Sequence, residues 1–98
     1  MKLKQYNESF VFRNGTTNAS KIQEFKGKKF KYSYSAGNAY ERFYVEMFDG
    51  LKLNPIADIT DMNAKPNSSA YLNTEVESLN RYAELCGNAE KYIINLLS

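Results

Sequence analysis

Residues 28–48 alternate apolar and polar side chains on both sides of the dipeptide Gly37-Asn38. Alternation with a period of two is typical of a strand that buries one face. Gly-Asn fits the two-residue loop that joins antiparallel strands. The segment therefore predicts a β-hairpin, and a chain with such a hairpin must find a second layer to cover its apolar face.

The loop position predicts the register of this hairpin. With Ala36 opposite Ala39, Tyr32 pairs with Phe43, and Phe30 pairs with Val45 on the apolar face. The polar face then pairs Lys29 with Glu46, Lys31 with Tyr44, Ser33 with Arg42 and Ser35 with Tyr40. A slip of one residue would exchange the two faces, so the sorting of side chains supports this register.

The first quarter of the chain begins with a strand pattern that leads into Asn14-Gly15, a strong hairpin-turn dipeptide. Residues 17–26 fit either a return strand or a short helix with capping residues at both ends. The three-residue spacing of Ala19, Ile22 and Phe25 slightly favours the helix.

Residues 51–62 predict a short third or fourth strand. Leu51 and Leu53 alternate, and Pro55 then interrupts the pattern. Proline is confined to edge strands and bulges, so we expect an irregular segment after it that covers the edge of the core. The turn-forming residues 63–69, NAKPNSS, separate this β-rich part from a helical part.

The C-terminal residues carry helix signals. Thr74 and Glu77 form a capping-box pattern at the start. One apolar face is predicted from the three- and four-residue steps of Val76, Leu79, Ala83 and Cys86. Gly87-Asn88 fits a helix end, so either two helices meet there or one bent helix passes through it.

Together these patterns predict one compact domain over residues 1–98, with a β-rich part over 1–62 and a helical part over 70–98. The fold class is α+β: a small antiparallel sheet of three to four strands, with its hairpin at 28–48, packed against a C-terminal helix or helix pair.

The environment expected for this chain is the cytoplasm. One cysteine among 98 residues allows no internal disulfide. The N-terminal residues contain no apolar stretch of the kind found in secretory signals, and the longest apolar run is far short of a membrane span.

Catalysis and cofactor binding are not expected from these residues. The chain contains no histidine, which removes the commonest general base and the Ser–His and Cys–His pairs. Cys86 lies on the apolar helix stripe and is interpreted as a packing residue. Asp58 and Asp61 fit a turn or a solvated loop better than a metal site, so no metal or other cofactor is predicted.

Charge is distributed unevenly along the chain. Residues 1–31 hold eight Lys and Arg against two Glu, a balance of +6, whereas residues 32–98 hold five against nine Asp and Glu, a balance of −4. This asymmetry indicates either a basic contact surface or two ends that neutralise each other in the fold.

The polar face of the hairpin is the predicted partner-binding surface. Tyr and Arg are the residues that most often anchor protein interfaces. The predicted partner-binding residues are Lys29, Lys31, Tyr40, Arg42 and Tyr44, and Lys26 and Lys28 are candidates for nucleic-acid contact. In the alternative interpretation, the lysine stems only shield the Tyr rings from water.

The favoured function is therefore a non-catalytic binding protein, and the alternative is a nucleic-acid-binding module that uses a Lys- and Tyr-rich hairpin. In size and composition the chain resembles small proteins of phages and mobile elements, such as anti-CRISPR proteins. The resemblance covers no motif. It implies a protein partner, for example one in a nucleic-acid-containing complex such as a host defence nuclease, which the bound protein would block sterically.

Overall fold

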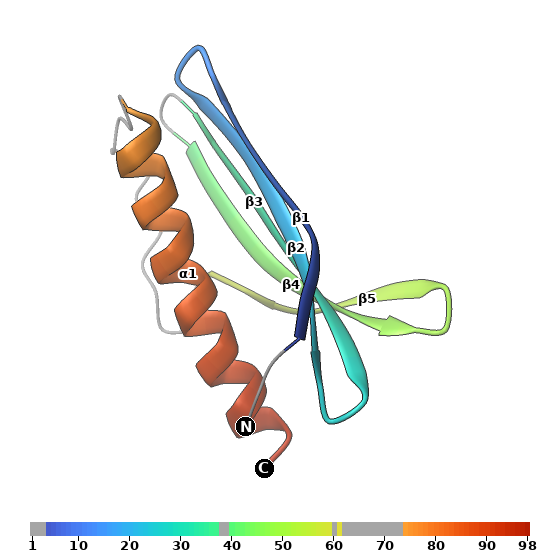
Figure 1. The fold of residues 1–98 in the computed structure, drawn as a ribbon. Helices are drawn as coiled ribbons and strands as arrows, with labels where there is room; N and C mark the ends of the chain where they lie inside the picture. The colour runs from blue at the N-terminus through green and yellow to red at the C-terminus, as the bar shows by residue number, and fades with distance from the viewer. Residues whose placement is uncertain (1–3, 38–39, 60, 62–73) are drawn as a thin grey trace.

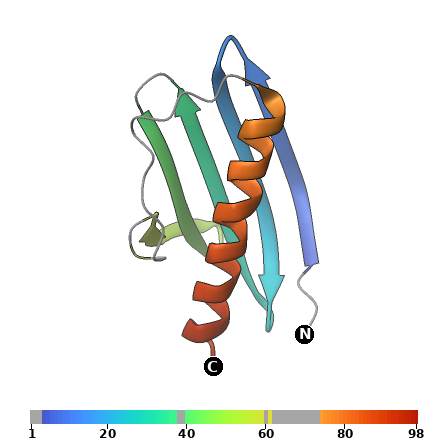
Figure 2. The same cartoon turned by 90° about the vertical axis from the view of Figure 1, so that its left-hand side faces the viewer.

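The computed structural model describes residues 4–37, 40–59, 61 and 74–98. Within these residues five strands are followed by one helix: β1 (Lys4–Arg13), β2 (Thr16–Phe25), β3 (Lys28–Gly37), β4 (Tyr40–Asp49), β5 (Lys52–Asp58) and α1 (Glu75–Leu96). The strands pair antiparallel in the order β1-β2-β3-β4-β5, and α1 packs on one face of the sheet (Figures 1 and 2). The expected α+β class is confirmed, with five strands instead of three to four.

The slight preference for a helix over residues 17–26 was wrong, because these residues form β2. Two-residue turns at both ends determine this outcome. Asn14 and Gly15 have φ of 52° and 76°, and Lys26 and Gly27 have φ of 54° and 77°. Two successive residues with positive φ match the twist of an antiparallel hairpin. Alternate residues of β2, from Thr17 to Phe25, are buried.

The predicted register of the β3–β4 hairpin was wrong by two residues. Gly37 pairs with Tyr40, so Tyr32 lies opposite Val45 and Tyr34 lies opposite Phe43. A shift of two residues keeps every side chain on its face, so alternation alone could not distinguish the two registers. Asn38, the second residue of the predicted loop, lies outside the described residues.

β5 continues through Pro55, where the sequence suggested an interruption. Val45 pairs with Ala57 and Glu46 pairs with Pro55, which leaves Ile56 as the extra residue of a bulge. An edge strand with a bulge accommodates proline because no ladder hydrogen bond from its nitrogen is required. Ile59 follows β5 and is buried in the core, as expected for the segment at the core edge. The predicted turn at 63–69 lies outside the described residues.

α1 is one continuous helix of 22 residues that passes through Gly87. Its N-terminus confirms the predicted cap, because the Glu77 amide donates to Thr74 Oγ1 at 3.1 Å. The predicted buried face was right at Cys86 and wrong at its other three positions, because Val76, Leu79 and Ala83 are exposed. Besides Cys86, the helix buries Ser78, Tyr82, Leu85, Ala89 and Ile93. Tyr82 supplies large aromatic surface to the sheet, and its burial places Val76 and Leu79 on the flank of the helix.

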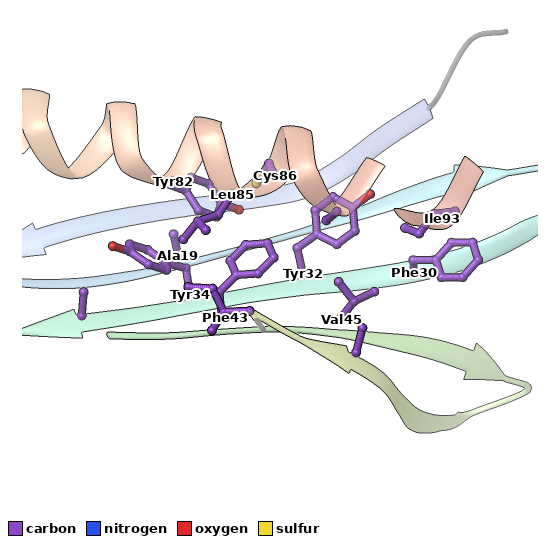
Figure 3. Packing of buried hydrophobic residues seen from close by; sticks show 14 of the residues in the cluster. Ala19, Phe30, Tyr32, Tyr34, Phe43, Val45, Tyr82, Leu85, Cys86 and Ile93 are labelled. Atoms are coloured by element: carbon purple, nitrogen blue, oxygen red, sulfur yellow. The ribbon is translucent and has the colours of Figure 1, made fainter. Parts of the chain in front are cut away.

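The core lies between α1 and the sheet, and aromatic rings fill its centre (Figure 3). Tyr82 of α1 stacks on Tyr34 of β3 with ring centroids 5.7 Å apart. Phe43 of β4 lies 6.3 Å from Tyr34 and 6.5 Å from Tyr82. Burial of these rings against one helix leaves the opposite face of the sheet available for contacts.

Polar contacts hold the helix at defined points on the sheet. Arg81 donates two hydrogen bonds of 2.8 Å to Glu41 of β4, and Tyr34 donates a third to the same carboxylate. The Thr17 and Ser78 hydroxyls are hydrogen-bonded in the buried interior. Because each of these groups has a partner in the interior, the contacts specify where α1 sits along the strands.

Candidate binding groove on the open face of the sheet

The sheet face opposite α1, which we call the open face, is covered by no element among the described residues (Figures 1 and 2). Alternation along β4 sends Phe43 toward the helix, where it is 2% exposed. The residues between these inward positions, Tyr40, Arg42 and Tyr44, project from the open face. Tyr40 and Tyr44 are 40% and 42% exposed, which is high for aromatic side chains of a strand.

A groove of about 520 Å³ lies on the open face across β2, β3 and β4. Small polar residues of β2 and β3 form its floor, and larger residues of β4 form one wall. The lining comprises Asn18, Ala19, Ser20, Ser33, Tyr34, Ser35, Tyr40, Arg42 and Tyr44. The register creates the hollow, since it places short serine side chains beside long side chains of β4.

Gly37 determines the position of the Tyr40 ring at one end of the groove. A Cβ atom on Gly37 would lie 2.6 Å from Tyr40 Cε1, well inside van der Waals contact. Gly37 and Tyr40 are a cross-strand pair, so the ring covers the backbone of its partner. Glycine allows the ring this position, and a larger residue at 37 would displace it.

Arg42 projects into the groove without a carboxylate opposite it, because its cross-strand partner is Ser35. The neighbouring acid on β4, Glu41, points to the other face and binds Arg81. Asp58, which lies opposite Tyr44, accepts a hydrogen bond of 3.1 Å from the Asp61 amide. Glu41 and Asp58 therefore each have a hydrogen-bond partner of their own.

Lys29 and Lys31 lie on the open face but outside the groove lining. The register places Glu24 opposite Lys29 and Glu46 opposite Lys31. Opposite charges on directly paired residues attract and reduce the local potential. Of these two pairings, only that of Lys31 with Glu46 joins the basic first part of the sequence to the acidic remainder.

Lys26 and Lys28 are separated from the other two lysines. Lys26 lies in the β2–β3 turn, and its ammonium group donates to the Leu97 carbonyl at 3.2 Å, near the end of α1. Alternation places Lys28 on the same side of β3 as Phe30, the side that α1 covers. The four lysines therefore do not form one continuous row.

The serine and asparagine floor of the groove was not predicted from the sequence. Ser33 and Ser35 alternate with Tyr32 and Tyr34, and this alternation was visible as a polar strand face. Their partners on β2 could not be found because the spacing within residues 17–26 favoured a helix. A strand assignment there would have placed Asn18 and Ser20 beside them.

Cys86, Asp58 and Asp61, which lie outside the groove lining, have structural surroundings that the described residues show. Cys86 belongs to the core, as expected, and burial raises the pKa of its thiol to about 11, which opposes formation of a thiolate at neutral pH. Asp58 and Asp61 close a turn by binding each other's backbone amides. The described part of the chain brings together no group of three His, Cys, Asp or Glu side chains that could hold a metal ion.

No protein-family model, curated protein or solved structure matches this chain. The described residues also include no helix that is long and apolar enough to cross a membrane. Functional inference therefore depends on the groove and on the charges around it.

Proposed function

We propose that this chain is a non-catalytic binding protein and that the open face of its sheet receives a protein partner. The supporting observation is the groove that brings Tyr40, Arg42 and Tyr44 together as one wall. Exposed Tyr and Arg side chains at the centre of a contact area are the usual anchors of protein interfaces. Tyrosine has few rotatable bonds, so ordering it on binding costs little conformational entropy.

Lys29 and Lys31 would act at the rim of this interface. Exposed rim charges mainly change the rate of association and its dependence on salt, and contribute less to the final affinity. A steric inhibitor of a host nuclease complex is one form of this proposal, because occupying the partner's working surface requires no chemistry from the bound protein.

A nucleic-acid-binding module is the second candidate. It is favoured by Tyr rings and lysines on the same sheet face, since rings can stack on bases while ammonium groups neutralise phosphates. The glutamates opposite Lys29 and Lys31 weaken this candidate, because they reduce the positive potential that a phosphate backbone requires.

A pull-down from host lysate, with and without nuclease treatment, would supply the partner, and a salt titration of the complex would then separate the candidates. Three proteins are compared: the wild type, the double variant Lys29→Gln/Lys31→Gln, and Tyr44→Ala. For a protein partner we expect Tyr44→Ala to weaken binding by about 2 kcal/mol or more. We expect the double variant mainly to slow association.

The opposite result would favour nucleic acid. In that case the captured material would disappear after nuclease treatment. The logarithm of the affinity for duplex DNA would fall with the logarithm of the salt concentration, with a slope of about −0.9 for each phosphate contacted. The double lysine variant would flatten this slope, and Tyr44→Ala would have no effect.

A further inference from the structure

We infer that the groove binds an extended acidic segment of the protein partner, with one carboxylate paired to Arg42 between the rings of Tyr40 and Tyr44. This inference rests on the proposed function of the open face and names the chemistry that the face recognises. Its basis is the charge, the hydrogen-bonding groups and the shape of the groove.

The charge in the groove is a single guanidinium group. Arg42 is the one charged residue among the described residues that line it. Its cross-strand partner is Ser35, and Glu41 on the same strand is bound by Arg81 on the other face. A guanidinium presents a planar set of donors that matches both oxygens of a carboxylate. The cross-strand partner of Arg42 is not an acid, so a carboxylate of a binding partner can pair with its guanidinium.

The surroundings of Arg42 favour a carboxylate on a peptide. Tyr40 and Tyr44 stand two residues before and after it on the same face, so a bound group is partly removed from water and the ion pair is strengthened. Ser33 and Ser35 line the floor beneath the wall. Their hydroxyls can donate to a carboxylate or accept from a peptide N–H.

The shape of the groove favours a segment over an isolated side chain. The groove crosses three strands and is open to solvent. Its volume of about 520 Å³ lies in the size range of ligand-binding sites. A phosphate backbone is less well matched, because its regularly spaced charges need a row of cations. Lys29 and Lys31 are the lysines of the open face, and each lies opposite a glutamate on the neighbouring strand.

The test is an NMR titration of isotope-labelled protein with two capped peptides of equal length. One alternates Glu with Thr, and the other alternates Gln with Thr. We expect the Glu peptide to shift the amide signals of Ser33, Ser35 and Tyr44 and to bind about tenfold or more tightly than the Gln peptide. Arg42→Gln should remove this difference, and Arg42→Lys should restore only part of it, because lysine lacks the planar pair of donors.

Arg13→Gln is the matched control, because Arg13 is an exposed arginine of β1 outside the groove lining. This variant should keep the preference for the Glu peptide. Equal affinity for the two peptides, or no binding of either, would overturn the inference. So would tighter binding of a single-stranded oligothymidylate through the same amides.

The failure of this inference can be distinguished from failure of the proposed function. If binding of a captured protein partner is weakened by Tyr44→Ala but the Glu peptide does not displace that partner, the proposed function is supported and the inferred preference for an acidic segment is wrong. If the Glu peptide binds through Arg42 but the captured partner is insensitive to Tyr44→Ala, the proposed interface is wrong.

Discussion

At the scale of single residues, neighbours on one strand have opposite environments. Phe43 is 2% exposed and contacts aromatic rings of the core, whereas Tyr44 is 42% exposed at the groove. Both are aromatic, and only the pleat of β4 separates them. Stability and binding are therefore expected to depend on different residues, even where those residues are adjacent in the sequence.

The first prediction compares these two positions. Phe43→Ala should lower the free energy of unfolding by about 3–5 kcal/mol, because it leaves a cavity among buried rings. Tyr44→Ala should change it by about 1 kcal/mol or less, since its side chain is exposed on the strand and leaves no buried cavity. Urea denaturation of both variants measures the difference. Similar losses would show that the assignment of faces along β4 is wrong.

The second prediction concerns pH and Cys86. Burial raises the pKa of this thiol from 9.0 to about 11, so the unfolded chain loses the thiol proton at lower pH than the folded chain. The contribution to stability is complete below pH 9 and is lost as the pH rises through 11. The loss at that pH is on the order of 2 kcal/mol.

Cys86→Ala is the control for this titration, because buried tyrosines also lose stability in strong base. Burial raises the pKa of Tyr32 and Tyr82 in both proteins. Urea unfolding between about pH 7 and about pH 11 should therefore show the wild type approaching the variant as the pH increases. A constant difference between the two proteins would contradict a buried neutral thiol.

At the scale of elements, α1 is held on the sheet by a buried ion pair as well as by apolar packing. The Glu41 side chain is 3% exposed and that of Arg81 is 16% exposed. Hydrogen bonding to Glu41 is the main cause of the raised pKa of Arg81. Arg81 also binds Glu84, whose side chain is 63% exposed. The two carboxylates on one guanidinium thus differ greatly in their access to water.

The third prediction uses this difference. Arg81→Met should cost about 3–5 kcal/mol of stability, because Glu41 remains buried without its cation. Glu84→Gln should cost about 1 kcal/mol or less, as for other exposed ion pairs. Thermal and urea unfolding would measure both. A small effect of Arg81→Met would show that water reaches Glu41 and that the pair does not position the helix.

The fourth prediction compares two glycines in different elements. Gly87 lies inside α1, and apart from its chain neighbours and the adjacent helix backbone no atom lies within 4 Å of the position that a Cβ would occupy there. Gly87→Ala should therefore stabilise the protein by about 0.5–1 kcal/mol. Gly37→Ala should destabilise it by about 1 kcal/mol or less, because the new methyl group displaces the exposed Tyr40 ring.

Unfolding measurements on both glycine variants give the stability changes, and the NMR signals of Tyr40 report the ring position. We expect those signals to shift in Gly37→Ala and to stay unchanged in Gly87→Ala. A tolerated alanine at residue 37 with unshifted Tyr40 signals would contradict the packed wall of the groove.

At the scale of the whole molecule, the two faces of one sheet have separate roles. α1 covers one face (Figure 1) and encloses the core, and the groove lies on the other face. The strands are neighbours in sequence order. Successive side chains along each strand point to opposite faces of the sheet. An antiparallel sheet with one covered face can therefore present a binding surface without disturbing the core.

The amino-acid sequence by itself determined the fold class, the hairpin faces and the helix cap. These depend on local signals: period-two alternation along Lys28–Gly37 and Tyr40–Asp49, the Asn14-Gly15 turn and the Thr74–Glu77 capping box. It also placed Tyr40, Arg42 and Tyr44 on a common face, because a register error of two residues leaves faces unchanged.

Only the tertiary structure decided the remainder. β2 (Thr16–Phe25) is stabilised by pairing with both neighbouring strands, which outweighs a weak local helix pattern. The buried face of α1 was selected by packing of Tyr82 against Tyr34. The groove depends on short side chains of β2 and β3 lying beside long side chains of β4, and the glutamates opposite Lys29 and Lys31 come from β2 and β4. Such contacts join distant residues, and no local pattern records them.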